Sequence, residues 1–161
     1  HTTTQAGDHW RSFLTDRGAE VALTDDLTVT GPGSYPGFRV NLRAVGELTP
    51  TIAAIAAFAD GPSELNGIGH LRGHETDRLA AIATELRRVG VAVEEREDGL
   101  DIDPAGRVAE SDATLQTYAD HRMATMAAVL ALRIPGLKVA DPQTTTKTMP
   151  DFVARWEAML A

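Results

Sequence analysis

The 161-residue sequence contains no cysteine. That absence excludes disulfide bonds, thiolate metal ligands and a cysteine nucleophile, and it is typical of a reducing compartment, so we expect a cytoplasmic protein. No apolar run approaches the roughly 18 residues of a membrane-spanning helix, so we expect no membrane partner. Hydrophobic residues make up 43% of the chain and charged residues 24%, a balance that predicts a globular protein with a real core.

Basic residues are also in short supply. The chain has 15 lysines and arginines against 23 aspartates and glutamates, which gives a formal net charge of −8. Such a chain repels nucleic acid over most of its surface, so we expect no nucleic-acid partner and only a local anion site. The sequence begins at His1 with neither an initiator methionine nor a signal-peptide pattern, which favours a boundary within a longer polypeptide.

The spacing of apolar residues predicts an α/β (α+β) fold in which short strands alternate with helices. Apolar positions three and four residues apart predict helices at 6–17, 47–59, 75–89, 121–133 and 149–160. Apolar runs bounded by Gly, Pro and Asp predict strands at 19–24, 27–30, 37–42, 64–68, 91–95, 99–103, 113–118 and 136–140.

The chain also carries an internal repeat. The segment 47–68 aligns with 120–141, and just upstream the segment 18–21 aligns with 90–93, with one residue inserted between the two alignments. We therefore predict two copies of one pattern of helices and strands, at about 6–78 and 79–161. No linker separates the copies, which favours a single domain over 1–161.

Asp120, His121 and Arg122 stand together at the first turn of a predicted helix. Unpaired backbone N–H groups and the helix dipole attract anions there, and an arginine can clamp a carboxylate or phosphate through two donors. The alternative is that Asp120 is only an N-cap while His121 and Arg122 are solvated. The three residues alone do not decide between these interpretations.

A second helix start has the same chemistry. His74, Glu75 and Arg78 begin the amphipathic helix upstream, and Thr76 or Asp77 can cap it. Alternatively, Glu75 and Arg78 form an ordinary ion pair within the first turn. The segment is not the zinc motif H-E-x-x-H, because Arg78 stands in place of the second histidine, so we expect no metal.

Two further charged residues precede helices. Lys147 lies in a threonine-rich run before Pro150, where it can contact a phosphate or act as a general acid. Glu47 precedes a helix whose first turn holds Pro50. The alternatives are a solvated loop lysine and a simple helix-start acid. The glycines of 67–73 miss the dinucleotide-binding spacing by one residue, so we expect no such cofactor.

Four motifs, in their order and spacing, carry a family resemblance. They are RAVGELTP at 43–50, GHETDRLAAIATEL at 73–86, YADHRMA at 118–124 and TTTKTMPDF at 144–152. Together they resemble the C-terminal part of the 5-enolpyruvylshikimate-3-phosphate synthase family, with a close likeness to actinobacterial forms. The resemblance runs over nearly the whole chain. It implies repeated βαβαββ units of the enolpyruvyl transferase fold, about two of them, in the second domain of a two-domain enzyme.

The resemblance implies a transferase of the shikimate pathway, which leads through chorismate to the aromatic amino acids and is the target of glyphosate. Such an enzyme moves the enolpyruvyl group of phosphoenolpyruvate to the 5-hydroxyl of shikimate 3-phosphate and releases phosphate, without a metal or organic cofactor. The resemblance places His74 at a contact to shikimate 3-phosphate. The residues that it places around phosphoenolpyruvate are Arg78, His121, Arg122 and Lys147.

The resemblance also implies three residues for proton transfer. Glu47 matches the carboxylate that accepts the proton of the reacting hydroxyl. Glu75 matches an acid/base group near the methylene carbon of phosphoenolpyruvate, and Lys147 is a second candidate that can protonate the leaving phosphate. How Glu75 and Lys147 divide the proton transfers stays open.

Some family features are absent from this sequence. The Lys-Ser and Ser-Ser-Gln segments that hold shikimate 3-phosphate in the family do not occur, and His74 stands where other members have lysine. We therefore expect a half-site that is inactive alone, with the missing N-terminal domain as its partner in an enzyme that is monomeric at full length. The alternatives are a relative of UDP-N-acetylglucosamine enolpyruvyl transferase and a non-catalytic anion-binding module.

Overall fold

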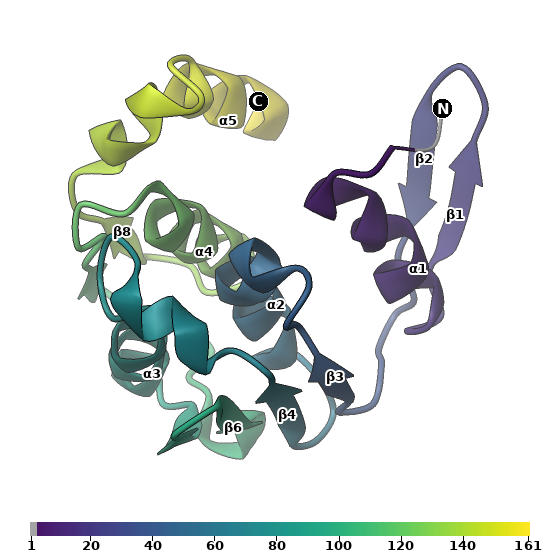
Figure 1. The fold of residues 1–161 in the computed structure, drawn as a ribbon. Helices are drawn as coiled ribbons and strands as arrows, with labels where there is room; N and C mark the ends of the chain where they lie inside the picture. Colours follow the sequence, from purple (N-terminus) through teal and green to yellow (C-terminus); the bar gives the residue numbers. More distant parts are fainter. Residues whose placement is uncertain (1–2) are drawn as a thin grey trace.

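Helices and short strands alternate along residues 3–161, the part of the chain that the computed structural model describes (Figure 1). The α-helices are α1 (His9–Thr15), α2 (Thr49–Ala56), α3 (Arg78–Arg88), α4 (His121–Ala131) and α5 (Phe152–Leu160). The strands are β1 (Glu20–Leu23), β2 (Leu27–Thr30), β3 (Arg39–Asn41), β4 (Ser63–Asn66), β5 (Ala92–Arg96), β6 (Gly99–Asp103), β7 (Thr114–Leu115) and β8 (Lys138–Val139). Short 3-10 turns occupy Ala6–Asp8, Gly46–Leu48, Gly69–Gly73, Pro104–Gly106 and Pro142–Lys147. The predicted α/β class is confirmed.

Four strands form the main sheet, in the order β3, β4, β6, β5. β3 runs parallel to β4, whereas β6 runs antiparallel to both β4 and β5. Leu65 of β4 lies opposite Leu100 of β6, and Ser63 lies opposite Ile102. All four residues are buried, and because side chains alternate between the two faces of a strand, they share one face of the sheet, which belongs to the core.

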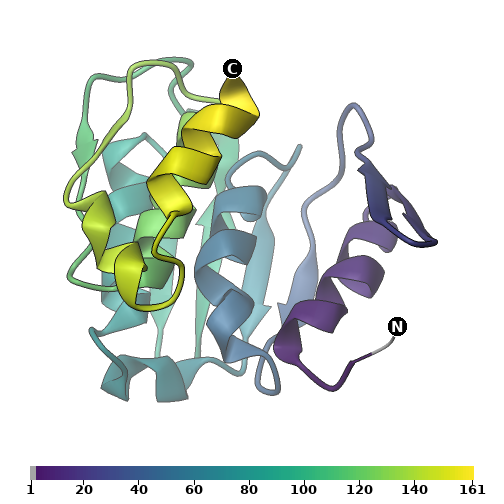
Figure 2. The ribbon, with the colours of Figure 1, turned by 90° about the horizontal axis from the view of Figure 1, so that it is seen from above.

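The helices α2 and α3 pack on the main sheet, and α4 packs on α2 and on the short parallel pair β7–β8 (Figures 1 and 2). Both helices carry small buried side chains. Ala53, Ala54 and Ala56 of α2 and Ala124 and Ala127 of α4 are fully buried. Alanine lets the two helices approach closely, which brings their first turns near one another. Within residues 3–161, no helix has the length and apolar content needed to cross a bilayer.

The helix α1 and the hairpin β1–β2 lie to one side of this body (Figure 2). Phe13 of α1 is buried, and its ring meets that of Phe38 edge to face at 5.5 Å. The guanidinium of Arg17 stacks on both rings, 3.6 Å from the centre of Phe13 and 4.1 Å from the centre of Phe38. This aromatic contact joins the N-terminal part to the core.

The order of elements is the same in the two halves of the chain. The alignment of 18–21 with 90–93 places the hairpin β1–β2 on the hairpin β5–β6, and the alignment of 47–68 with 120–141 places α2 on α4 and, continued, α3 on α5. The pair β3–β4 and the pair β7–β8 are both parallel. The main sheet takes strands from both sides of residue 78, so hydrogen bonding crosses the predicted boundary between 6–78 and 79–161. That division stays a prediction about the sequence.

Several predicted elements prove shorter than expected. The strand predicted at 113–118 is confined to Thr114–Leu115, because the chain turns at Tyr118 and Ala119 with positive φ. The helix predicted at 75–89 begins at Arg78, after its cap. Helices predicted at 6–17, 47–59 and 149–160 begin late, because a 3-10 turn or a proline-containing loop occupies the first predicted residues.

Candidate active site

A buried ion pair joins the start of α3 to the start of α4. Asp120 is the N-cap of α4, as predicted, and its Oδ1 accepts a hydrogen bond from the Arg122 backbone N–H at 2.8 Å. Its Oδ2 accepts a hydrogen bond from Arg78 Nε at 2.7 Å. The side chains of Asp120 and Arg78 are 0% and 3% exposed. Each charge has lost its hydration, and the other charge offsets that cost. The pair fixes the two helix starts relative to one another.

The same contacts set the charge state of Asp120. Burial acts to raise the pKa of its carboxyl group, but the hydrogen bonds from Arg78 and from the Arg122 backbone N–H outweigh burial, so the pKa lies below its ordinary value. Asp120 is therefore a carboxylate at neutral pH. The outer nitrogens of Arg78 are not used in the bond to Asp120, and one of them, Nη1, lies 3.5 Å from Nδ1 of His74.

Glu75 lies just before α3 and forms a second charged group. Its Oε1 accepts a hydrogen bond from Lys147 Nζ, and its Oε2 lies 3.4 Å from Nδ1 of His121. The hydrogen bond from Lys147 holds the pKa of Glu75 below its ordinary value, so Glu75 is also a carboxylate at neutral pH. The alternative of an ion pair between Glu75 and Arg78 within one helical turn is wrong, because α3 begins only at Arg78 and each residue has another partner.

Arg122 connects α4 to the turn before α2. Its Nη1 donates to the backbone oxygen of Glu47 at 2.9 Å, and its Nη2 lies 3.5 Å from Oε2 of the same residue. The side chain of Glu47 is 53% exposed and that of Arg122 is 32% exposed. Both groups therefore remain accessible to a small anion or hydroxyl compound.

One neighbouring residue escaped the sequence analysis. His70 faces His74, with ring centres 6.0 Å apart, and its Nε2 would lie 2.6 Å from a Cβ placed on Gly46. The absence of a side chain at Gly46 thus lets His70 pack beside the turn that carries Glu47. The spacing of four residues between His70 and His74 is the signal that could have found it.

The structure thus brings every predicted site residue into one connected group. The group comprises Glu47, His74, Glu75, Arg78, His121, Arg122 and Lys147, arranged around Asp120. Arg78 and Arg122 stand at the starts of two helices, where backbone N–H groups add positive potential, and Lys147 stands at the end of a 3-10 turn. Such a cluster suits a ligand with two anionic groups.

The group also contains a possible set of metal ligands. Ligand atoms of Glu75, Asp120 and His121 lie within 4.8 Å of one another. However, Lys147 already neutralises Glu75 and Arg78 already neutralises Asp120, so a divalent ion would meet two cations at close range. The donor set therefore fits a metal poorly, and the absence of a metal stays a prediction.

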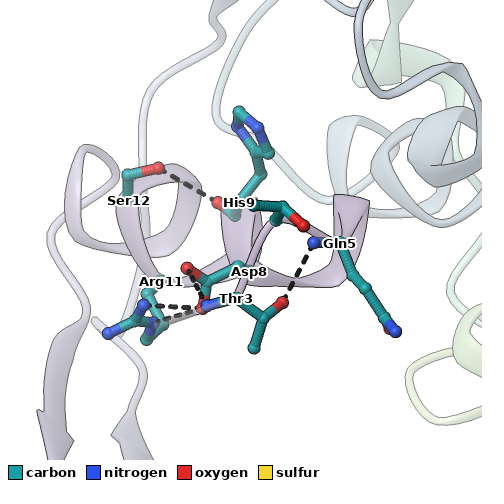
Figure 3. Close-up of a pocket in the computed structure, with 7 residues that line it drawn as sticks. Thr3, Gln5, Asp8, His9, Arg11 and Ser12 are labelled. Atoms are coloured by element: carbon teal, nitrogen blue, oxygen red, sulfur yellow. Dashed lines mark hydrogen bonds and ion pairs between the residues drawn. The ribbon is translucent and has the colours of Figure 1, made fainter. Parts of the chain in front are cut away.

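A hollow of about 410 Å³ lies elsewhere, beside α1 (Figure 3). It is lined by Thr3, Thr4, Gln5, Asp8, His9, Arg11 and Ser12. Its one cation, Arg11, is paired with Asp8 at 2.6 Å within the described residues. None of the predicted site residues lines it, so this hollow offers no support for the predicted chemistry.

Comparison with known proteins places the chain in a family. The family model of EPSP synthase (3-phosphoshikimate 1-carboxyvinyltransferase) matches residues 1–156. Relatives named 3-phosphoshikimate 1-carboxyvinyltransferase include one from Kocuria rhizophila, 53% identical over 98% of this chain, and one from Bifidobacterium longum, 48% identical over 99%. This chain spans 35% and 37% of the length of those two relatives.

Solved structures have the same fold at lower identity. The EPSP synthase of Acinetobacter baumannii superposes with a TM-score of 0.80 at 22% identity, over 96% of this chain and 39% of that one. The enolpyruvyl transferase NikO of Streptomyces tendae gives a TM-score of 0.72 at 18% identity, over 91% of this chain and 34% of that one. Because the family model matches nearly the whole chain and the relatives from Kocuria rhizophila and Bifidobacterium longum are 53% and 48% identical to it, the chain belongs to the EPSP synthase (3-phosphoshikimate 1-carboxyvinyltransferase) family.

Proposed function

We propose that this chain supplies the phosphoenolpyruvate-facing half of a 3-phosphoshikimate 1-carboxyvinyltransferase. The whole enzyme transfers the enolpyruvyl group of phosphoenolpyruvate to the 5-hydroxyl of shikimate 3-phosphate and releases phosphate. The observation that carries the proposal is the cluster of Arg78, Arg122 and Lys147 around the carboxylates of Asp120 and Glu75. Phosphoenolpyruvate brings a carboxylate and a phosphate, and both need cations in fixed positions.

The anionic groups of phosphoenolpyruvate bind first to the exposed cations Arg122 and Lys147. They also reach the outer nitrogens of Arg78, which is 3% exposed, where His74 now lies. Arg122 turns its guanidinium toward the Glu47 turn and is 32% exposed, so a carboxylate or phosphate can take over its contacts. The Nε of Arg78 is held by Asp120, which orients the outer nitrogens of the guanidinium for a bidentate contact. His74 contacts shikimate 3-phosphate, and His121 lines the pocket beside Glu75.

Proton transfer follows from the carboxylates. Glu47 accepts the proton of the 5-hydroxyl while the hydroxyl oxygen bonds to C2 of phosphoenolpyruvate. C3 gains a proton in the same step, which gives a tetrahedral adduct. Loss of that proton from C3 then expels phosphate and restores the double bond. Glu75 is a carboxylate and Lys147 is its hydrogen-bonded ammonium partner, so the pair holds one acidic proton. That proton is given to C3 in the addition step, and the proton that C3 loses in the elimination step returns to the pair and passes to the leaving phosphate.

Apart from His74 and Glu47, the site for shikimate 3-phosphate lies on a partner. The chain spans about a third of its relatives' length, and the segments that hold shikimate 3-phosphate belong to the N-terminal domain, which is the partner of this half-site. The half-site alone is inactive and needs neither metal nor organic cofactor. The complete enzyme works as a monomer in the cytoplasm, without a nucleic-acid or membrane partner.

Titration of the chain with phosphoenolpyruvate tests the binding half of this proposal. Phosphorus NMR measures the binding. Replacing Lys147 by alanine removes a charge-assisted contact and weakens binding about tenfold or more. Lys138, the only other lysine, lies on β8 outside the site, so Lys138→Ala is the matched control and leaves binding unchanged. Equal binding by Lys147→Ala and Lys138→Ala would remove Lys147 from the site.

A further inference from the structure

Two residues with left-handed backbone stand directly before the candidate active site. Tyr118 has a φ of 56° and Ala119 a φ of 54°, and the Asp120 N–H donates to the Thr117 oxygen at 2.8 Å. Positive φ at both central residues defines a type I′ turn, which is dominated by Gly, Asn and Asp. Tyrosine and alanine rarely adopt this conformation. Other contacts must therefore hold the turn.

Glu85 provides those contacts from the middle of α3. Its side chain is 0% exposed, and its Oε1 accepts a hydrogen bond from the Tyr118 hydroxyl at 2.6 Å. Its Oε2 accepts a hydrogen bond from the Gln116 backbone N–H at 3.0 Å, and Arg88 Nε lies 3.2 Å away as a counter-charge. The two hydrogen bonds come from Gln116 and Tyr118, on either side of Thr117. One buried carboxylate therefore holds the segment that leads into the turn.

The tyrosine hydroxyl is firmly engaged in this contact. Tyr118 is 37% exposed, but desolvation of its hydroxyl raises its pKa to about 12, and the hydrogen bond to the Glu85 carboxylate acts in the same direction. A buried carboxylate is costly unless it is fully hydrogen-bonded, yet neither Glu85 nor Tyr118 takes part in the proposed chemistry. Their contact serves the turn.

We propose that Glu85 and Tyr118 are positioning residues for the phosphoenolpyruvate site, because their hydrogen bond holds the turn Thr117–Asp120 in the conformation that presents Asp120 and Arg122. This inference rests on the proposed function of Arg78 and Arg122 as substrate-binding residues. The turn sets where Asp120 stands, Asp120 caps α4 and orients Arg78, and Arg122 follows two residues later. Neither Glu85 nor Tyr118 touches the substrate.

Removal of one hydroxyl tests the proposal in the 161-residue chain. Tyr118→Phe deletes the hydrogen bond to Glu85, and Tyr35→Phe is the matched control, since its hydroxyl donates to the Ile55 oxygen at 2.8 Å. Tyr118→Phe increases amide hydrogen exchange at Arg122 about tenfold relative to the amides of β6, which neither tyrosine hydroxyl contacts, and weakens phosphoenolpyruvate binding by a similar factor. Tyr35→Phe changes neither ratio. Equal effects of the two variants would overturn the proposal.

A second substitution separates positioning from general stability. Asparagine adopts positive φ more readily than alanine, so Ala119→Asn favours the turn even without the tether, which is the hydrogen bond between Tyr118 and Glu85. In the Tyr118→Phe background, Ala119→Asn restores the slow exchange at Arg122. Failure to restore it would show that Tyr118 does not act by holding the turn.

The hydrogen-exchange measurement also separates this inference from the proposed function. If the wild-type chain bound no phosphoenolpyruvate, the proposed function would fail. Exchange at the Arg122 amide would still decide whether the tether holds the turn, since that amide donates to Asp120 without any ligand. Binding by wild type with unchanged exchange in Tyr118→Phe would overturn the tether alone.

Discussion

A single carboxylate, Asp120, links folding to the site. One of its oxygens caps α4 and the other holds Arg78, so the residue that starts one helix also orients a cation from the start of another. The cap follows from local chemistry and was predictable from the sequence. For α3 the sequence allowed Thr76 or Asp77, and the structure has Asp77, whose side chain accepts from the Ala80 N–H at 3.1 Å. The pairing of Asp120 with Arg78 was not predictable, because it joins residues 42 positions apart.

Asp120→Asn tests the buried ion pair separately from the cap. Asparagine still caps a helix, but Arg78 is left as a buried charge without a counter-ion, so the variant loses about 3 kcal/mol of unfolding free energy in urea. Asp151→Asn is the control, since its contact with Arg155 is 3.8 Å long and exposed, and it costs less than about 0.5 kcal/mol. Similar losses in the two variants would contradict the assigned ion pair.

The effect of Asp120→Asn also depends on pH. The pKa of Asp120 in the folded chain is lowered below its ordinary value of 3.8, so the unfolded chain takes up the proton first as the pH falls. The contribution of the carboxylate is therefore complete above that value and is lost as the pH falls through the lowered pKa. The difference in urea stability between wild type and Asp120→Asn shrinks toward acid pH. A difference that grew on acidification would refute this sign.

At the scale of elements, the close contact of α2 and α4 positions the site. Fully buried alanines at this contact let the first turns of both helices meet, and there Arg122 reaches the backbone oxygen of Glu47. The sequence predicted the existence and order of the helices and the strands β1 to β6. It overestimated the lengths of β7 and β8, because alternation of apolar residues carries no signal for the positive φ of Tyr118 and Ala119 after β7 or of Gly136 and Asp141 around β8.

Ala53→Leu tests this contact. Ala53 is 0% exposed in the helix that packs on α4, so three additional carbon atoms shift α2 against its neighbours and cost about 1–3 kcal/mol of unfolding free energy. Phosphoenolpyruvate binding weakens with it, since Arg122 moves away from Glu47. Ala154→Leu, on an exposed position of α5, is the control and leaves both the melting temperature and binding unchanged. Unaltered binding by a destabilised Ala53→Leu would argue against a positional role for the contact.

At the scale of the whole molecule, a chain with a net charge of −8 gathers three cations into one group. Asp120, Glu47 and Glu75 pair with these cations, so an anionic substrate has to replace carboxylate contacts and does not meet a net positive patch. The motifs predicted which residues belong together, because each lies at the start of a predicted helix or just before it. They did not predict which carboxylate pairs with which cation, since Lys147 reaches Glu75 only through the packing of α4 against the turn Pro142–Lys147.

Product formation from phosphoenolpyruvate and shikimate 3-phosphate, followed by mass spectrometry, tests the proposed half-site most directly. The chain is assayed alone and mixed with the part of the Kocuria rhizophila relative that this chain does not match, which is the remainder of that relative's length. The half-site proposal predicts the enolpyruvyl product only in the mixture, and none when Lys147→Ala replaces the wild-type chain. Product from the chain alone, or no product in a mixture that still binds phosphoenolpyruvate, would contradict it.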